Sequence, residues 1–232
     1  MSNIKPIIVI TGASGGIGQY LIDKLCTDYE IIGTYNKHEP SLDRRCALYK
    51  VDVCDEQSVA NFTVEVKDKL KNIILINVAG ISLDDMGHKM PSDVWDKVID
   101  TNLKGTFLFC RAMLPFMREQ EWGRIINMSS IVGQIGVPGT VAYSASKSGL
   151  FGMTRTLAIE NAVKKITVNV LTLGYFDIGM ISVIKPDLQE RIKENIPMRK
   201  FGDPRNIELA VRFLIESNYI TGTSININGG LY

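Results

Sequence analysis

Apolar and polar residues follow two different periods along the chain. Short runs rich in β-branched residues predict strands at residues 7–10, 31–35, 47–53, 73–77, 124–128, 167–172 and 224–227. Helical spacing predicts helices at residues 17–26, 93–119, 143–162 and 207–215, the second interrupted near Pro115. Strands that alternate with helices are typical of βαβ units. The pattern therefore predicts an α/β fold with a doubly wound, Rossmann-type parallel sheet of about seven strands and helices on both faces.

Residues 179–202 lie outside this alternation. The segment is polar, helical in part, and begins and ends with glycine. We expect it to cover the strand ends as a mobile lid, with an ordinary surface helix as the alternative. No repeat, low-complexity tract or linker divides the chain, so residues 1–232 are expected to form one domain.

Composition narrows the classes of protein. The 232 residues are 45% hydrophobic and 22% charged, and the net charge of +1 gives no basic field for nucleic acid. No apolar stretch approaches the ~20 residues of a membrane helix, and the first apolar run is too short for a signal-peptide core. A cytoplasmic protein without membrane contact is expected. The four cysteines lack metal-finger spacing and there are only two histidines, His38 and His88, so no metal site is predicted.

A glycine-rich stretch, TGASGGIG at Thr11–Gly18, follows the first predicted strand. Glycines between a strand and a helix let backbone N–H groups approach a pyrophosphate, so this turn predicts a dinucleotide site. A tight turn without a ligand is the alternative. GASGG also matches the nucleophile elbow of hydrolases, with Ser14 as the nucleophile. Hydrolases of that fold need a histidine late in the chain, whereas both histidines are early, so the hydrolase reading is disfavoured.

YSASK places Tyr143 and Lys147 four residues apart in a predicted helix after the fifth strand. Positions i and i+4 share one face, so both side chains should lie at the carboxyl edge of the sheet, where open α/β folds bind ligands. A neighbouring ammonium favours phenolate, so Lys147 is expected to lower the pKa of Tyr143. The pair predicts a general acid–base site, with a chance surface pair as the alternative. Ser129 and Ser130, just after the fifth strand, favour the site because a serine hydroxyl there could bond the same reacting oxygen.

Several motifs together resemble the short-chain dehydrogenase/reductase family. They are TGASGGIG, NVAG at Asn77–Gly80, Ser130, YSASK and VNVLTLG, in this order over nearly the whole chain. The ending, IPMRKFGDPRNIELAVRFL followed by YITGTSININGGLY, resembles the 3-oxoacyl-[acyl-carrier-protein] reductase branch. The resemblance implies that Tyr143 is the acid/base and that Lys147 lowers its pKa and binds the nicotinamide ribose. Ser130, thirteen residues before the tyrosine as in the family, would position the carbonyl, and Asn102 in DTNLKGTF would help to hold a water in a proton relay.

The resemblance also implies a nicotinamide dinucleotide along the strand ends, with adenine near Asp52 and Val53. Tyr143 and Lys147 belong to the predicted cofactor site, together with Gly12, Ser14, Gly15, Gly16, Ile17, Gly18, Tyr35, Asn36, Lys37, Asp52, Val53, Asn77, Ala79, Gly80, Gly174 and Phe176.

The end of the second strand predicts which dinucleotide is used. NAD enzymes of this architecture carry an acid there for the ribose 2′-hydroxyl, but here Tyr35 is followed by Asn36 and Lys37. Asn36 can donate to a 2′-phosphate and Lys37 can pair with it, so NADP is predicted, with NAD as the alternative. Gly15 occupies the position where many NADP-dependent relatives carry a basic residue.

Three residues depart from the family pattern. Val78 replaces an asparagine, Leu173 replaces a proline, and Ile178 replaces a threonine that bonds the nicotinamide amide. An isoleucine cannot make that bond, so altered cofactor affinity or orientation is expected.

The leading interpretation is an NADPH-dependent reductase of a 3-oxoacyl thioester, carried on acyl carrier protein in the branch that the ending resembles. A reductase or dehydrogenase of a sugar-derived or other small polar carbonyl is the alternative within enzymes. A non-catalytic dinucleotide-sensing protein is the alternative from another class. The resemblance further implies a homotetramer with the last strand near a subunit interface.

Overall fold

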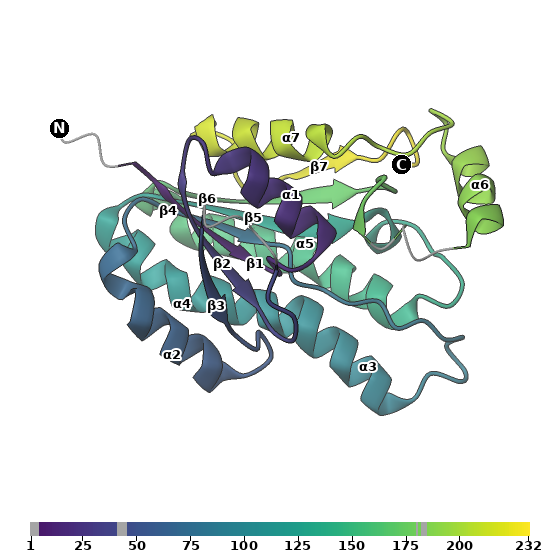
Figure 1. Cartoon of the computed structure of the whole chain (residues 1–232), viewed down its shortest axis with the longest axis horizontal. Helices are drawn as coiled ribbons and strands as arrows, with labels where there is room; N and C mark the ends of the chain where they lie inside the picture. Colours follow the sequence, from purple (N-terminus) through teal and green to yellow (C-terminus); the bar gives the residue numbers. More distant parts are fainter. Residues whose placement is uncertain (1–4, 41–45, 180, 182–184) are drawn as a thin grey trace.

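The computed structural model describes residues 5–40, 46–179, 181 and 185–232 of the chain. Its centre is a seven-stranded parallel sheet in the order β3-β2-β1-β4-β5-β6-β7 (Figure 1). The strands are β1 (Ile7–Thr11), β2 (Glu30–Tyr35), β3 (Ala47–Lys50), β4 (Ile73–Asn77), β5 (Gly123–Ser130), β6 (Ile166–Leu173) and β7 (Ser224–Ile227). The helices are α1 (Gly16–Leu25), α2 (Glu56–Val66), α3 (Ser92–Ile99), α4 (Gly105–Gln120), α5 (Val141–Asn161), α6 (Pro186–Asn195) and α7 (Arg205–Glu216). The predicted α/β fold with a doubly wound sheet is confirmed.

The central strands form because the sheet buries their side chains on both faces. Ile7 and Val9 of β1 pack in the cluster that α2, α4 and α5 cover, whereas Ile8 and Ile10 pack in the cluster beneath α1 and α7. Residues 73–76 of β4 alternate in the same way. A parallel strand covered on both faces has a nearly continuous apolar sequence, which is the pattern that predicted these strands.

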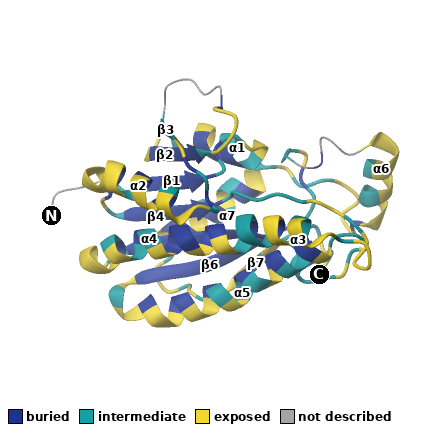
Figure 2. Ribbon diagram, turned by 90° about the horizontal axis from the view of Figure 1, so that it is seen from below, coloured by how far each residue is buried: buried dark blue, intermediate teal, exposed yellow. Residues whose placement is uncertain are grey.

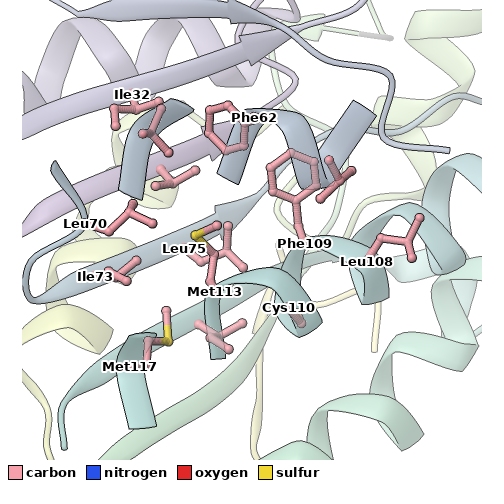
Figure 3. Packing of buried hydrophobic residues seen from close by; sticks show 14 of the residues in the cluster. Ile32, Phe62, Leu70, Ile73, Leu75, Leu108, Phe109, Cys110, Met113 and Met117 are labelled. Carbon is pink, nitrogen blue, oxygen red and sulfur yellow. The ribbon is translucent and has the colours of Figure 1, made fainter. Parts of the chain in front are cut away.

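Aromatic and sulfur-containing side chains pack among the aliphatic ones on the first of these faces (Figure 3). The ring centroids of Phe62 on α2 and Phe109 on α4 lie 5.7 Å apart. Met113 and Met117 continue this row along α4 at the four-residue spacing of a buried helix stripe. Each fully buried side chain of this size contributes about 1.5–3 kcal/mol, so this face anchors α4 and the turn that precedes it.

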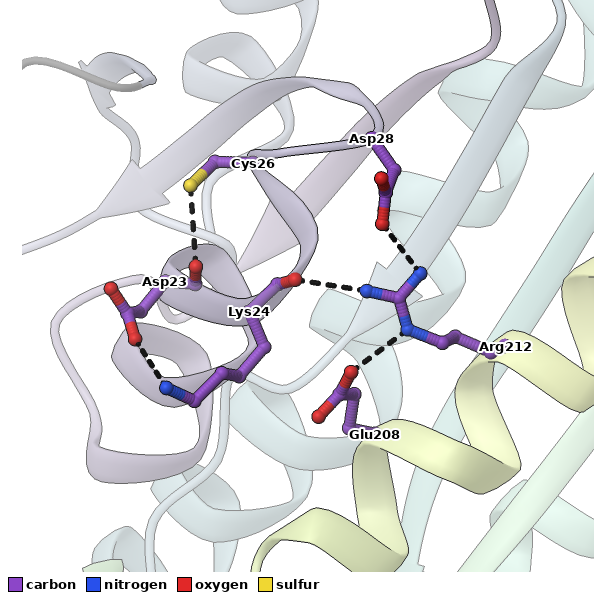
Figure 4. Close-up of polar contacts among 6 residues, drawn as sticks. All are labelled: Asp23, Lys24, Cys26, Asp28, Glu208 and Arg212. Carbon is purple, nitrogen blue, oxygen red and sulfur yellow. Dashed lines mark hydrogen bonds and ion pairs between the residues drawn. The ribbon is translucent and has the colours of Figure 1, made fainter.

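Ion pairs and hydrogen bonds join α7 to the end of α1 on the other face (Figure 4). Arg212 Nε donates to Glu208, and one terminal nitrogen donates to Asp28, each over 2.8 Å. The other terminal nitrogen donates to the Lys24 carbonyl over 2.9 Å. The planar guanidinium satisfies three partners at fixed angles. This fixes the helix that begins at the glycine turn against the C-terminal part of the chain.

The segment from α3 to α4 is continuous helix, as predicted, but the helix is interrupted at a different place from the predicted Pro115. A π-helical turn at Asp100–Lys104 separates the two helices, whereas α4 runs through Pro115. Pro115 faces solvent, so the carbonyl that loses its N–H partner there can bond to water. The π turn places Asn102 at the site described below.

Two further elements differ from the predicted ranges. Helix α2 was not predicted, although Asp55 is its N-cap and accepts a hydrogen bond from the Gln57 N–H over 3.0 Å. Strand β3 ends at Lys50 rather than at residue 53. The last hydrogen bond to β2 is the one from the Val51 N–H to the Tyr35 carbonyl, and the chain then leaves the sheet.

The predicted lid, residues 179–202, includes residues 180 and 182–184, which lie outside the described residues. Helix α6 projects beyond the strand ends and none of its residues is buried (Figure 2). Ile196, directly after it, is buried. The lid therefore stays a prediction.

Among the described residues, no helix combines the length and the apolar content needed to cross a bilayer. The same residues contain no cluster of three or more histidine, cysteine, aspartate or glutamate side chains arranged to hold a metal ion.

Candidate active site

The site lies at the carboxyl edge of the sheet, where β1 and β4 are neighbours but their connections run in opposite directions. Such a switch point leaves a crevice between the two loops, and open α/β sheets bind ligands there. The Thr11 hydroxyl closes the base of this crevice, accepting hydrogen bonds from the N–H groups of Val78 and Ala79 over 3.1 and 3.2 Å. The glycine turn and NVAG are thereby brought together.

The glycine turn has the dimensions of a phosphate-binding loop. Gly12 has a φ of +72°, and a Cβ on Gly18 would lie 2.3 Å from the Gly12 carbonyl oxygen. The turn can therefore close only without these side chains. Gly15 and Gly16 are exposed at the start of α1, whose first turn contains no acid. An N-terminus with exposed N–H groups and no competing carboxylate fits a pyrophosphate.

The residues at the end of β2 that are predicted to bind the cofactor lie beside this turn. Thr34 of β2 pairs with Thr11 of β1, so Tyr35, Asn36 and Lys37 follow directly at the same edge. Asn36 and Lys37 are exposed, and the Tyr35 hydroxyl donates to Glu39 over 3.2 Å. On the other side of β2, the Asp52 carboxylate is held by the Cys54 N–H at 2.9 Å.

The Asn77 side chain is directed away from the crevice. Its Nδ2 donates to Asn127 Oδ1 over 2.8 Å, and the residue is buried between β4, β5 and α4. Hydrogen bonding inside the sheet holds its amide nitrogen, while Asn77 Oδ1 is buried without a hydrogen-bond partner. Its predicted contact with the cofactor stays a prediction. Ala79 and Gly80 lie farther along the same loop and are partly exposed.

The pleat of β5 separates the two candidate serines. Ser129 is buried and its hydroxyl donates to the Lys147 carbonyl over 3.0 Å. Ser130 points to the opposite side, where its hydroxyl accepts from the Val132 N–H over 3.4 Å and is close enough to Tyr143 to lower the pKa of the phenol. Side chains alternate across a strand, so only one of two consecutive serines can face the site. That serine is Ser130.

Tyr143 and Lys147 share one face of α5 beneath this serine. Lys147 Nζ lies 5.6 Å from the centre of the Tyr143 ring and donates to the Met128 carbonyl over 2.8 Å. Burial raises the pKa of Tyr143 to about 12, although the neighbouring Ser130 hydroxyl opposes this. Burial also lowers the pKa of Lys147 to about 8. The expected lowering of the tyrosine pKa by Lys147 is therefore not found, because the loss of water around the phenol is the largest influence on its pKa.

Asn102 and Lys147 frame a small gap above Gly80. A Cβ on Gly80 would lie 3.2 Å from Asn102 Oδ1 and 3.5 Å from Lys147 Nζ. The Asn102 amide donates to the Ile81 carbonyl and to the Ser146 hydroxyl, over 2.9 and 3.0 Å, while its oxygen accepts from the Ile81 N–H over 2.8 Å. Both amide hydrogens are used, so this side chain has no donor left for a water.

The comparisons with known proteins agree with this geometry. Residues 27–232 match the family model described as Enoyl-(Acyl carrier protein) reductase. The chain is 36% identical to Nodulation protein G of Azospirillum brasilense, over 98% of both chains. It is 36% identical to a 3-oxoacyl-[acyl-carrier-protein] reductase of Staphylococcus epidermidis, over 97% of this chain and 98% of the relative. It is 38% identical to an acetoacetyl-CoA reductase of Shinella zoogloeoides, with the same two coverages.

The chain belongs to the short-chain dehydrogenase/reductase family. It is therefore an NAD(P)-dependent oxidoreductase, as the sequence predicted.

The residues that depart from the family pattern have structural partners. Leu173 is buried and extends the β6 ladder opposite Ile227 of β7. Val78 packs beneath α1 and α7, where an asparagine would need a polar partner. Ile178 lies beside the glycine turn, with its Cγ1 3.2 Å from the place of a Cβ on Gly16. An apolar contact thus stands where a hydroxyl is usual in this short-chain dehydrogenase/reductase family.

The residues after β6 have roles that the sequence did not separate. Gly174 packs against Asn228, since a Cβ would lie 2.7 Å from the Asn228 Cα, and Phe176 is buried against Gly202. Phe176 is thus held by Gly202 and also lines the cavity at this edge, so its place beside the nicotinamide stays a prediction. Asp84 and Tyr175, which the sequence analysis did not single out, lie near enough to Tyr143 to raise the pKa of its phenol. The only sequence signal of Tyr175 is its position directly after Gly174.

Proposed function

We propose that this protein reduces the keto group of a 3-oxoacyl thioester, with NADPH as the reductant. The observation that carries the proposal is the buried Lys147 ammonium 5.6 Å from the centre of the Tyr143 ring, with the Ser130 hydroxyl close enough to lower the pKa of the phenol. A hydroxyl donor and an acid at the carboxyl edge, beside a glycine turn fit for a dinucleotide, support a carbonyl reductase. The printed names of two relatives, a 3-oxoacyl-[acyl-carrier-protein] reductase and an acetoacetyl-CoA reductase, support this substrate class.

The side chains divide the work by their chemistry. When bound, the nicotinamide supplies the hydride that attacks the carbonyl carbon. The Ser130 hydroxyl donates a hydrogen bond to the substrate oxygen and holds it against the phenol. Tyr143, protonated because its pKa is raised to about 12, gives its proton to the oxygen as negative charge develops there. The Lys147 ammonium stabilises the phenolate that remains.

Asn102 acts through the loop after β4 rather than through a free amide. Its side chain pairs with both backbone groups of Ile81 and so holds Gly80 in place. A ribose would lie at the mouth of the gap above Gly80, within reach of Lys147 Nζ, because the gap itself is barely large enough for a methyl group. Gly12, Ser14, Gly15, Gly16, Ile17 and Gly18 would hold the pyrophosphate, and Asp52 and Val53 the adenine. Asn36 and Lys37 would hold the 2′-phosphate that distinguishes NADPH.

A cavity of about 1040 Å³ beside the ends of β6 and β7 supports a large substrate. Its described wall includes Tyr175 and apolar side chains such as Ile196, but not Ser130, Tyr143 or Lys147. The cations Lys193, Arg199 and Lys200 line it together with Asp177 and Asp203. An apolar wall suits an acyl chain and the excess of cations suits a phosphate, which favours a thioester of a phosphorylated carrier.

A carbonyl panel tests the proposal. Acetoacetyl-CoA, acetoacetyl-acyl carrier protein and a keto sugar are each offered with NADPH and with NADH, and the NAD(P)H absorbance is followed. We expect the largest kcat/KM for an acetoacetyl thioester with NADPH. A larger value for the keto sugar would replace the proposed substrate class. Dinucleotide binding with no turnover on the whole panel would favour the sensing protein instead.

A further inference from the structure

Ser146, the fourth residue of YSASK, is fully buried although it is polar. Its hydroxyl donates to the Tyr143 carbonyl over 2.7 Å. The same oxygen accepts a hydrogen bond from Asn102 Nδ2 over 3.0 Å. One hydroxyl therefore joins the first turn of α5 to the π turn that precedes α4.

The connection continues from Asn102 to the loop after β4. Asn102 is fully buried and brackets Ile81 through both its backbone N–H and its carbonyl, at 2.8 and 2.9 Å. A chain of hydrogen bonds thus runs from the backbone beside Gly80, through Asn102 and Ser146, to the backbone of Tyr143. It links three segments that are far apart in the sequence, and buried bonds of this kind fix segments relative to one another.

We propose that Ser146 is a positioning residue for proton donation by Tyr143. It holds the first turn of α5 in register with Asn102 and with the gap above Gly80, so that the phenol meets the substrate oxygen held by Ser130. The proposal rests on the proposed reductase function of the same site. Ser146 itself would contact neither substrate nor cofactor, because its hydroxyl is hydrogen-bonded to the Tyr143 carbonyl and to the Asn102 amide.

Loss of the hydroxyl has a definite consequence for the site. In Ser146→Ala one Asn102 N–H loses its acceptor inside the core, and this buried donor stays unsatisfied unless the segments move. A movement that restores a partner would shift α5 against the π turn. Because a displacement of about 1 Å at a reacting group costs on the order of 10²-fold in rate, the effect should appear in kcat.

Thr154 provides a matched control on the same helix. Its side chain is buried, and its hydroxyl accepts from Asn127 Nδ2 over 2.9 Å, so Thr154→Val also orphans a buried asparagine N–H. Asn127 leads to Asn77 in the sheet, away from Tyr143. The two variants should lose similar stability, but only the Ser146 variant should disturb the acid.

The experiment compares wild type, Ser146→Ala and Thr154→Val on the thioester that the wild type reduces. Tm, NADPH affinity, KM, kcat and the pH profile of kcat are measured for each. We expect kcat of Ser146→Ala to fall by about 10–100-fold with KM and NADPH affinity within about twofold, and kcat of Thr154→Val to stay within about twofold. A kcat of Ser146→Ala within twofold of wild type, or an equal loss in Thr154→Val, would overturn the proposal.

Ser146→Cys covers the case in which the alanine variant does not fold. It keeps nearly the same volume, but a thiol is a weak acceptor, so kcat should again fall. Wild-type kcat in this variant would equally overturn the proposal. If the wild-type protein reduces no carbonyl of the panel, the proposed function is wrong. If the wild type is active and the Ser146 variants keep its kcat, only the role of Ser146 is wrong.

Discussion

The Lys147 ammonium lies 5.6 Å from the centre of the Tyr143 ring, one turn farther along the same face of α5. Ser130, at the end of β5, is close enough to the phenol for its hydroxyl to lower the pKa of Tyr143. A substrate oxygen that enters between Ser130 and Tyr143 would accept a hydrogen bond from each hydroxyl.

Replacing Tyr143 by phenylalanine removes the acid and keeps the ring. We expect kcat to fall by about 10²–10⁴-fold, because this is the usual contribution of a general acid, while NADPH binding stays near wild type. Ser130→Ala should lower kcat as well, and the double variant should lose less than the product of the two effects, because both groups act on one oxygen. Steady-state kinetics and cofactor titration test this. Wild-type turnover in Tyr143→Phe would contradict the mechanism.

The reduction should have a descending limb near pH 8. Burial lowers the pKa of Lys147 to about 8, so its ammonium is present below that pH and is lost above it. Tyr143 stays protonated over the same range because its pKa is about 12. The profile of kcat/KM against pH should therefore be flat below pH 8 and fall above it. Lys147→Met, which cannot titrate, should have low activity without this limb; a limb that persists would assign it to another group.

Gly80→Ala tests the gap between Asn102 and Lys147. The added methyl would lie 3.2 Å from Asn102 Oδ1 and 3.5 Å from Lys147 Nζ, and would crowd the ammonium that is to bind the ribose. We expect NADPH affinity to fall by at least about tenfold, or about 1.4 kcal/mol, in isothermal titration. Gly136→Ala is the control, since nothing lies within 4 Å of its added Cβ. Equal affinity in the two variants would remove the ribose from the mouth of this gap.

Lys37→Ala tests the choice of NADPH over NADH. An exposed lysine that pairs with a 2′-phosphate should contribute about 1.5–3 kcal/mol, so kcat/KM for NADPH should fall by about tenfold or more, and that for NADH should not change. Lys67→Ala, also an exposed lysine but on the 3-10 turn after α2, should leave both values unchanged. A wild-type preference for NADH would overturn the assignment to NADPH.

The C-terminal face should carry a subunit contact of the expected homotetramer. Leu209 and Phe213 are half exposed on one face of α7, and β7 is an edge strand of the sheet. Exposed apolar side chains beside an open edge are typical of an interface. We expect wild type to scatter light as a tetramer and Phe213→Asp as a smaller species. Val64→Asp, at an exposed position on α2, should remain tetrameric. A monomeric wild type at micromolar concentration would contradict the expectation.

The sequence by itself determined the sheet and the place of the site. A strand such as residues 73–77 is buried on both faces, so its composition shows it without knowledge of its neighbours. The same holds for a local turn, since Gly12 and Gly18 are only six residues apart and must lack side chains to close it. Tyr143 and Lys147 share a face because helix geometry alone brings positions four apart together.

Only the tertiary structure decided what depends on contacts between distant segments. The family spacing selects Ser130, but only the packing of β5 against α5 shows that the Ser129 hydroxyl is used by the Lys147 carbonyl. Bonds across the sheet turn Asn77 inward, and Gly202 buries Phe176. Burial, a property of the whole fold, lowers the pKa of Lys147, whereas the spacing of YSASK predicted only a lowered tyrosine pKa. Sequence spacing fixes local neighbours, but the water removed around a charge and the partner of a buried amide are set by segments far along the chain.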